Sequence, residues 1–365
     1  MPKAAFCHWR IFKGWGIAAA FAIMRLNMQP QRILIVRLSA IGDVIQTMPV
    51  ACALRERFPD ATLVWAVEQR AGALLQGHEA LDELILLPRG WLKSLGEVRR
   101  LRRRLREFNF DATVDVQSLT KSAVLAWLSG ARRRIGFGNP GGRELSKWLN
   151  NERVDPKSTH VIDRYLELLG PLGIQRPTVS FQVPESQADR LTAERIIGEH
   201  SLDEGYAIVN PGAGWPSKLW PTERFAAVAR HLGASLRLPT LVVWAGAAER
   251  GAAERIVAEG GRLAVLSPPT SLPELAALAR RAKLFIGSDT GPLHLAAAVD
   301  TPCVGLYGPW PAARHGPYGP RHIALQKMFF EGPTRARRTA PPIYMESITT
   351  EMVCEACDEI LNRDY

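Results

Sequence analysis

The sequence has few cysteines, and they do not form an obvious set of pairs. Its 365 residues include only Cys7, Cys52, Cys303, Cys354 and Cys357. An odd, scattered set is not the framework of a disulfide-stapled secreted domain and fits a reducing compartment. The last two have C-x-x-C spacing, but no second pair completes a zinc site, and the residues around them predict a closing amphipathic helix. We therefore expect free thiols here, with no metal or redox centre.

Long apolar runs are also scarce near the N-terminus. The apolar stretch 14–24 is shorter than the roughly 20 residues that a membrane-spanning helix needs. Residues 1–30 are basic and aromatic, and no convincing cleavage site follows them. They are either a membrane-surface segment or the product of a mis-assigned start codon, with Met24 and Met28 as alternative starts. We leave this N-terminal extension outside the fold prediction.

Negative charge is in deficit, because the formal net charge is +10. The excess comes mainly from arginines at 99–106 and 132–134. This balance favours an acidic partner such as nucleic acid, anionic lipid or an acidic glycolipid, although a charge run can also be a solvated helix face. No signature of a nucleic-acid-binding module is present, so we expect no nucleic-acid partner.

What the chain does have is the length and 47% hydrophobic content for two α/β domains. Short apolar strands alternate with helices from residue 32 onward, which predicts parallel sheets. We expect an N-terminal domain at 31–175, a linker at 176–184 that includes an edge strand, and a C-terminal domain at 185–345. A last helix within 346–365 is expected to pack back toward the N-terminal domain.

The segment 284–298 reads as a buried strand, a tight turn and a helix start. Gly291 allows close approach of a ligand, and Pro292 suits a first helical turn. A helix N-terminus at a strand end offers unpaired N–H groups and partial positive charge, which suits a diphosphate. The alternative is an ordinary strand–helix junction.

Other strand ends carry candidate groups. Asp43 follows the strand at 32–37 and is a candidate general base, with helix capping as an equal alternative. The loop 210–221 carries glycines and Lys218, which could neutralise a leaving phosphate, but it is neither a Walker loop nor a G-x-G-x-x-G fingerprint. Gln117 and its neighbours, and Arg134 after the next helix, add polar groups to the first domain's rim.

Taken together, these segments resemble glycosyltransferase family 9, the ADP-heptose:lipopolysaccharide heptosyltransferases. The likeness runs from Arg32 to Ile360, and 65–68 looks more like the enzyme that adds the first heptose. An extension before Arg32 and a weakly matching tail at 335–343 depart from the family pattern. The matching segments are Leu34–Val44, Asp115–Ser122, Arg134–Phe137, Asn210–Ala213, Lys218–Pro221 and Ser288–His294.

The resemblance implies a GT-B fold, in which two Rossmann-like domains with parallel sheets face each other across a cleft. It implies inverting transfer of heptose from ADP-heptose, bound by the C-terminal domain, to an acidic Kdo-lipid A type acceptor on the N-terminal domain. No cofactor or metal is implied. The enzyme would be cytoplasmic and peripheral on the inner face of the inner membrane.

The resemblance also assigns roles residue by residue. Asp43 matches the proposed catalytic aspartate, Lys218 the diphosphate contact and Glu249 a ribose-binding glutamate. The nucleotide-sugar site would further contain Gly212, Ala213, Asp289, Thr290, Gly291 and His294.

The chemistry of these residue types agrees with such a reaction. One carboxylate can take the acceptor's proton, and a lysine with a helix N-terminus can stabilise the departing diphosphate. For the acidic acceptor we expect contacts from Gln117, Lys121 and Arg134, and for anionic lipid the run 99–106. Two alternatives stay open: a GT-B enzyme with another nucleotide sugar, and a non-catalytic protein that binds nucleotide sugar or nucleic acid.

Overall fold

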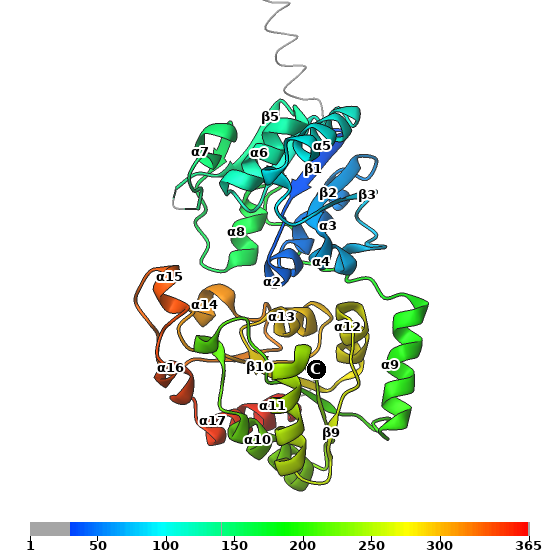
Figure 1. Ribbon diagram of the computed structural model, residues 1–365, viewed down its shortest axis with the longest axis vertical. Helices are drawn as coiled ribbons and strands as arrows, with labels where there is room; N and C mark the ends of the chain where they lie inside the picture. The colour runs from blue at the N-terminus through cyan, green and yellow to red at the C-terminus, as the bar shows by residue number, and fades with distance from the viewer. Residues whose placement is uncertain (1–29, 140, 364–365) are drawn as a thin grey trace, which may run out of the picture.

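The computed structural model describes residues 30–139 and 141–363 and contains two parallel six-stranded sheets, one above the other in Figure 1. The predicted extension at 1–30 lies almost wholly outside the described residues. The first sheet has the order β3-β2-β1-β4-β5-β6. Its strands are β1 (Arg32–Val36), β2 (Thr62–Glu68), β3 (Glu83–Leu87), β4 (Ala112–Asp115), β5 (Arg133–Phe137) and β6 (Glu152–Val154).

Helices cover both faces of the first sheet, which explains why its central strand is a continuous apolar run. Ile33 and Ile35 of β1 point into a core with α3 (Met48–Arg57) and α8 (Val161–Glu167). Leu34 and Val36 point the other way, toward α5 (Leu95–Glu107) and α6 (Thr120–Ser129). The short helix α7 (Ser146–Leu149) packs beside α6.

The single helix expected after β1 is two helices. The first is α2 (Ile41–Ile45), and α3 begins at Met48 after a break. Pro49 explains the break, because it has no N–H to bond back to Ile45 and fits only the first turn of a new helix. The short α2 presents Asp43 at the sheet edge.

The second sheet has the order β12-β11-β10-β7-β8-β9. The strands of each sheet are parallel, so within a sheet all the loops that follow the strands lie at one end, the carboxyl end. The strands are β7 (Ala207–Asn210), β8 (Thr240–Val242), β9 (Ala264–Leu266), β10 (Leu284–Ser288), β11 (Cys303–Leu306) and β12 (Ile323–Leu325). The helices are α9 (Gln187–Glu199), α10 (Thr222–Ser235), α11 (Gly246–Glu259), α12 (Leu272–Arg281), α13 (Gly291–Ala298), α14 (Ala312–His315), α15 (Thr334–Arg337), α16 (Ile343–Glu346) and α17 (Thr350–Leu361).

The last helix, α17, belongs to the second domain, so the expectation that it returns to the first domain is wrong. Val353, Cys357 and Ile360 lie three or four residues apart and pack in the core of the second sheet, next to α10. Figure 1 shows α17 in the lower domain, next to α10. Its apolar stripe is satisfied there and leaves no apolar face for the first domain.

The expected edge strand in the linker is not found: residues 174–186 contain neither helix nor strand. Its first part is held by the first domain. The His78 Nε2 donates to the carbonyl of Phe181 at 3.0 Å, and the Cys52 thiol lies 3.5 Å from the side-chain oxygen of Gln182.

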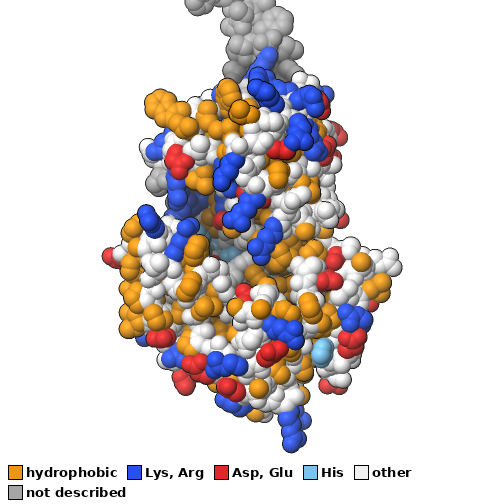
Figure 2. All heavy atoms as spheres, viewed as in Figure 1, with side chains coloured by type: hydrophobic (Ala, Val, Ile, Leu, Met, Phe, Trp, Pro, Cys, Tyr) orange, Lys and Arg blue, Asp and Glu red, His pale blue; other side chains and the backbone are white. Residues whose placement is uncertain are grey.

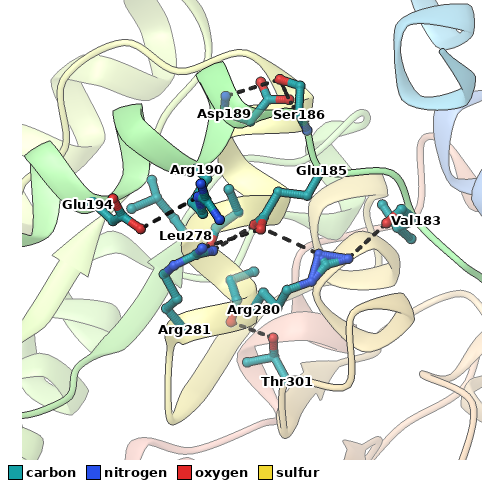
Figure 3. Close-up of polar contacts among 12 residues, drawn as sticks. Val183, Glu185, Ser186, Asp189, Arg190, Glu194, Leu278, Arg280, Arg281 and Thr301 are labelled. Atoms are coloured by element: carbon teal, nitrogen blue, oxygen red, sulfur yellow. Dashed lines mark hydrogen bonds and ion pairs between the residues drawn. The ribbon is translucent and has the colours of Figure 1, made fainter. Parts of the chain in front are cut away.

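The following residues are held by the second domain (Figure 3). Arg280 donates to the carbonyl of Val183 at 2.8 Å, and Arg281 lies 2.6 Å from the Glu185 carboxylate. Since Gln182 is bound by the first domain and Val183 by the second, the chain passes between the domains at the Gln182–Val183 peptide bond. Gln182 has a φ of 46°, in the left-handed region.

The two domains touch along their facing edges. Helix α2 packs against α13 between the two sheets in Figure 1. Beside them, His160, the N-cap residue of α8, donates to the carbonyl of Gly316 at 2.9 Å, and Tyr318 donates to Asp163 at 2.8 Å. These contacts bring the carboxyl-end loops of the two sheets together.

Candidate active site

A cleft of about 550 Å³ lies between the domains and is lined by residues of both. From the first domain come α2 and Arg70, and from the second come the loops after β7, β8 and β10. Most residues predicted for catalysis and donor binding from the sequence are therefore neighbours, although they come from positions 43 to 294.

Asp43 lies at the N-terminal side of this cleft, with one oxygen bound and the other less engaged. Its Oδ2 lies 2.6 Å from Arg37 Nη2 and accepts from the Ala40 N–H at 3.2 Å. Its Oδ1 is 3.4 Å from the Tyr165 hydroxyl, and the side chain is 35% exposed. Asp43 therefore caps α2, which was the alternative to a role as general base, and it still presents Oδ1 as a proton acceptor.

Arg37 keeps this carboxyl ionised. Burial opposes the charge on Asp43, but the ion pair and hydrogen bond with Arg37 and the bond from the Ala40 N–H together outweigh it and hold the pKa of Asp43 below its ordinary value. Arg37 is itself buried, donates to the carbonyl of Val116 at 3.2 Å and lies over the ring of Tyr165. No local pattern around Arg37 or Tyr165 indicates these roles.

On the opposite wall, Lys218 and Asp289 form an ion pair. Lys218 Nζ is 2.5 Å from Asp289 Oδ2 and 3.0 Å from the Asp289 carbonyl, and it lies 4.3 Å from the centre of the Trp310 ring. Asp289 is buried, which disfavours its charge, yet Lys218 and His294 hold the pKa of Asp289 well below its usual range. A cation is thus fixed beside the β10–α13 turn.

His294 connects this pair to the first domain. Its Nε2 lies 3.1 Å from Asp289 Oδ1, and its Nδ1 lies 3.4 Å from Gln46 Nε2. Because the amide nitrogen of Gln46 only donates, His294 accepts at Nδ1 and carries its proton on Nε2. Gln46 was not predicted, since in the sequence it looks like an ordinary residue of the first helix.

The N-terminus of α13 opens on the same cleft. Thr290 is its N-cap residue but makes no capping bond with its side chain, which instead accepts from Asn210 at 3.3 Å. The side chain of Thr290 therefore does not cap the N–H groups of the first turn, which are those of Gly291 and Leu293 because Pro292 has none. Gly291 lies against Ile41 of the first domain, so a side chain would not fit there.

Gly212, Ala213 and Glu249 form a third part of the cleft. Glu249 accepts from the Ala245 N–H at 2.8 Å, and burial raises the pKa of Glu249. A β-carbon on Gly212 would lie 2.3 Å from the Glu249 carboxyl carbon. The glycine therefore makes room for the carboxylate, and the two predicted residues are in contact.

Two of the three predicted acceptor residues lie near Asp43. Gln117 accepts from the N–H of Leu38 at 2.9 Å, in the loop that leads to α2. Lys121 Nζ bonds to Ser39 at 3.2 Å and to Glu68 at 2.9 Å. Both therefore border the strand-end loop that carries the candidate base.

Arg134 does not share this position. It is the second residue of β5, whose carboxyl end is Phe137, so it lies toward the amino end of the strands, away from the loops that line the cleft. Its guanidinium donates to the carbonyls of Leu149 and Ala131 at 2.7 and 2.9 Å. These contacts hold the strand in place. The structure therefore does not place Arg134 beside Gln117 and Lys121, as the sequence analysis had grouped them.

Several cleft residues had no recognised signal in the sequence. Burial lowers the pKa of His315 to about 4, so this imidazole is neutral at neutral pH. Arg338 stacks over Trp215 at 4.4 Å. Further lining residues include Trp215, Trp244, Trp310, His315 and Arg338.

Over residues 30–139 and 141–363, no three or more His, Cys, Asp or Glu side chains are grouped to hold a metal ion. In the same part of the chain, no helix has the length and apolar character needed to cross a membrane.

Residues 98–343 match the model of glycosyltransferase family 9 (heptosyltransferase). The chain is 30% identical over 310 residues to lipopolysaccharide heptosyltransferase 1 of Pseudomonas aeruginosa, covering 82% of this chain and 84% of that protein.

Solved structures agree. A glycosyl transferase family 9 structure from Veillonella parvula superposes with a TM-score of 0.79 at 25% identity, covering 91% of this chain and 97% of that one. The E. coli heptosyltransferase WaaC with ADP gives 0.73 at 26% identity, covering 90% and 99%. The same enzyme has been solved with ADP-2-deoxy-2-fluoro heptose, at a TM-score of 0.70. The fold is therefore of the GT-B type, and the chain belongs to glycosyltransferase family 9, the heptosyltransferases.

Proposed function

We propose that this protein is an inverting glycosyltransferase that moves heptose from ADP-heptose to an acidic inner-core lipopolysaccharide acceptor of the Kdo-lipid A type. One observation carries the proposal. An ionised carboxylate, Asp43, lies on one wall of the cleft, and a fixed cation beside a helix N-terminus, Lys218 at α13, lies on the other. This is the arrangement that a single displacement requires.

In this reaction, Asp43 Oδ1 takes the proton of an acceptor hydroxyl as the hydroxyl oxygen attacks the anomeric carbon. The bond from that carbon to the diphosphate oxygen breaks, and ADP leaves. Arg37 and the Ala40 N–H occupy Oδ2, whereas Oδ1 accepts only a long bond of 3.4 Å from the Tyr165 hydroxyl, so Oδ1 is the oxygen that takes the proton. Attack from the side opposite the leaving group inverts the anomeric centre.

The departing ADP gains negative charge as the bond breaks. Lys218 and the N–H groups of α13 would then bind the transition state more strongly than the ground state. Asp289 holds Lys218 in position through its ion pair, and His294 holds Asp289. Glu249, beside Gly212, is in a suitable place for the ribose hydroxyls.

ADP-heptose is the favoured donor because of the relatives. The proteins of similar sequence are lipopolysaccharide heptosyltransferases, and a structural relative has been solved with a fluorinated ADP-heptose. The acceptor would bind the N-terminal domain at 31–175, next to Gln117 and Lys121. The donor would bind the C-terminal domain at 185–345, to which α17 also belongs.

An acceptor of this kind is anchored in a membrane. We therefore place the enzyme in the cytoplasm, in peripheral contact with the inner face of the inner membrane. No cofactor or nucleic-acid partner enters the proposed reaction.

Calorimetry with ADP, UDP and GDP tests the donor base. We expect ADP to bind at least tenfold more tightly than the other two, and equal affinities would contradict the assignment. Turnover of ADP-heptose with a Kdo-lipid A acceptor tests the reaction, and NMR of the product should show an inverted anomeric centre. The charge-stabilising groups are protein groups, so EDTA should leave the rate unchanged. Loss of activity that magnesium restores would overturn the metal-free reaction.

A further inference from the structure

Helices α5, α6 and α7 form one layer over a face of the first sheet. Helix α5 packs against α6, and α6 packs against α7. Arg106 fixes the first pair, because its Nε donates to the carbonyl of Leu128 at 3.0 Å and its guanidinium lies against Gly130. We refer to the outward side chains of these helices and of the turn before α7, residues 143–145, as the helix-layer surface.

The helix-layer surface exposes large apolar side chains. Leu95 is 75% exposed, Trp127 51%, Leu145 54% and Trp148 84%. A nearly fully exposed tryptophan with apolar neighbours on adjacent helices marks an interaction surface more often than ordinary solvent-facing helix. Tryptophan is also the side chain enriched where protein meets the boundary between membrane and water.

The same surface carries unpaired positive charge. Helix α5 has six arginines and two glutamates. Arg100 and Arg104 are paired with Glu97 and Glu83, and Arg106 is used between helices.

The remaining arginines of α5 are Arg99, Arg102 and Arg103. They are exposed and make no ion pair within the described part of the chain, and Arg143 adds another exposed cation next to Leu145. In Figure 2, the upper domain shows hydrophobic side chains set among many lysine and arginine side chains.

We propose that the helix-layer surface binds the surface of an anionic phospholipid bilayer. Trp148, Leu145 and Trp127 enter the interfacial region, and Arg102 and Arg103 face the headgroups. Each cation near such a surface favours binding about fivefold. A second copy of this chain is a poor occupant, because two surfaces of the same positive sign would repel each other.

The placement also orients the enzyme, a step that rests on the proposed function. Lys121 is the second residue of α6 and contacts Ser39, next to the cleft residue Ala40, and Trp127 lies six residues, or about 9 Å, further along the same helix. A lipid-linked acceptor held in the bilayer under Trp127 could thus reach the cleft at Lys121. The bilayer contact itself needs neither donor nor acceptor.

The test is sedimentation of the full chain with vesicles of phosphatidylcholine alone or mixed equally with phosphatidylglycerol. The apolar variant is Trp148→Ser with Leu145→Ser, and the charge variant is Arg102→Gln with Arg103→Gln. The matched controls are Leu191→Ser on α9 and Arg255→Gln on α11, where Leu191 is 54% exposed and Arg255 is also exposed. All six side chains face solvent, so circular dichroism should show unchanged folding.

Wild type and both controls should bind the anionic vesicles and bind neutral vesicles weakly. The charge variant should lose about 20- to 30-fold in partitioning at low salt, and this difference should shrink at about 200 mM salt. The apolar variant should lose about tenfold or more at both salt concentrations, because apolar burial is not screened.

Three results would overturn the proposal. Wild type could fail to bind anionic vesicles, both variants could bind as wild type does, or wild type could be a dimer that the apolar variant converts to monomers. Binding that survives both variants would instead assign membrane contact to other residues, such as 1–29. Because the assay contains no donor or acceptor, its failure leaves the heptosyl-transfer assays unaffected, and failure of those assays leaves this one unaffected.

Discussion

Gly42 and Gly291 face each other across the domain interface. A β-carbon on Gly42 would lie 3.7 Å from the Gly291 Cα and 3.0 Å from Cδ2 of His294. A β-carbon on Gly291 would lie 2.9 Å from Cγ2 of Ile41. Two helix N-termini from different domains, one carrying the candidate base and one forming the candidate phosphate site, can approach this closely only because neither glycine has a side chain.

Gly291→Ala should therefore separate α2 from α13 and lower kcat by about 10- to 100-fold, since small misplacements of reacting groups are costly. ADP affinity, measured by calorimetry, should change much less, because the donor site lies within one domain. Gly214→Ala is the matched control, as its β-carbon would meet nothing within 4 Å in the same cleft. Wild-type turnover by Gly291→Ala would show that the glycine contact does not set the catalytic distance.

Asp43→Asn should lower kcat by about 10² to 10⁴, the effect of losing a general base. ADP should bind as before, since Asp43 is on the other wall. The variant also removes the carboxylate that pairs with the buried Arg37, so the melting temperature of the variant should fall as well. Kinetics are therefore measured well below that temperature. A variant that is less stable but retains most of its turnover would make Asp43 only a helix cap and an ion-pair partner.

The sequence predicted the sheets and the positions of Asp43 and Asp289 at strand ends, and it did so for a physical reason. Strands such as β3 and helices such as α12 follow from local apolar spacing, and a strand's carboxyl end locates Asp43 and Asp289 at an edge. Arg37, Gln46 and Tyr165 escaped notice because their roles exist only through tertiary contacts. Local pattern alone also could not decide which sheet the apolar stripe of α17 would cover.

Arg134 is a different kind of error. It lies in β5, a strand that the sequence pattern did not predict, and near that strand's start, so its side chain cannot share a rim with those at the carboxyl end of the sheet. Reading the strand's direction along the sequence would have separated it from Lys121.

Lys218→Ala should weaken ADP binding by about 10- to 100-fold, because a hydrogen bond to a charged group is worth roughly 1.5–3 kcal/mol. Turnover should fall further, since the contact strengthens as ADP departs. Calorimetry and steady-state kinetics separate the two effects. Lys283→Ala removes an exposed lysine just before β10 and is the control. Equal behaviour of the two variants would exclude Lys218 from the donor site.

Asp115→Asn should stabilise the protein at neutral pH. Burial raises the pKa of Asp115 from an ordinary 3.8 to about 6. The native state thus binds more protons between these pH values, so the stability that this group contributes falls as pH rises through that window. The asparagine removes a cost of at most about 3 kcal/mol above pH 6. It can still accept from Ser118, and the unpartnered side-chain oxygen of Asn150 can accept from it after the Asn150 amide rotates.

Urea unfolding at pH 4 and at pH 7.5 measures this effect. The gain should appear at the higher pH and be small or absent at the lower one. A variant that is less stable than wild type at pH 7.5 would mean that the carboxylate's hydrogen bonds outweigh its burial.

Lys121 and Arg134 should behave differently, although both were predicted to grip the acceptor. Lys121 Nζ lies beside Ser39, the residue before Ala40 of the cleft, and its side chain is 33% exposed, so it can exchange Glu68 for an acceptor carboxylate or phosphate. Lys121→Ala should raise the acceptor KM by about tenfold or more and leave ADP affinity unchanged. Arg134→Ala should leave the acceptor KM unchanged and lower the melting temperature, because the carbonyls of Leu149 and Ala131 lose their donor. Kinetics at saturating ADP-heptose and thermal unfolding of both variants make the comparison. If Arg134→Ala raises the acceptor KM while its stability is unchanged, the acceptor extends to the opposite edge of the sheet and its placement beside Gln117 and Lys121 is wrong.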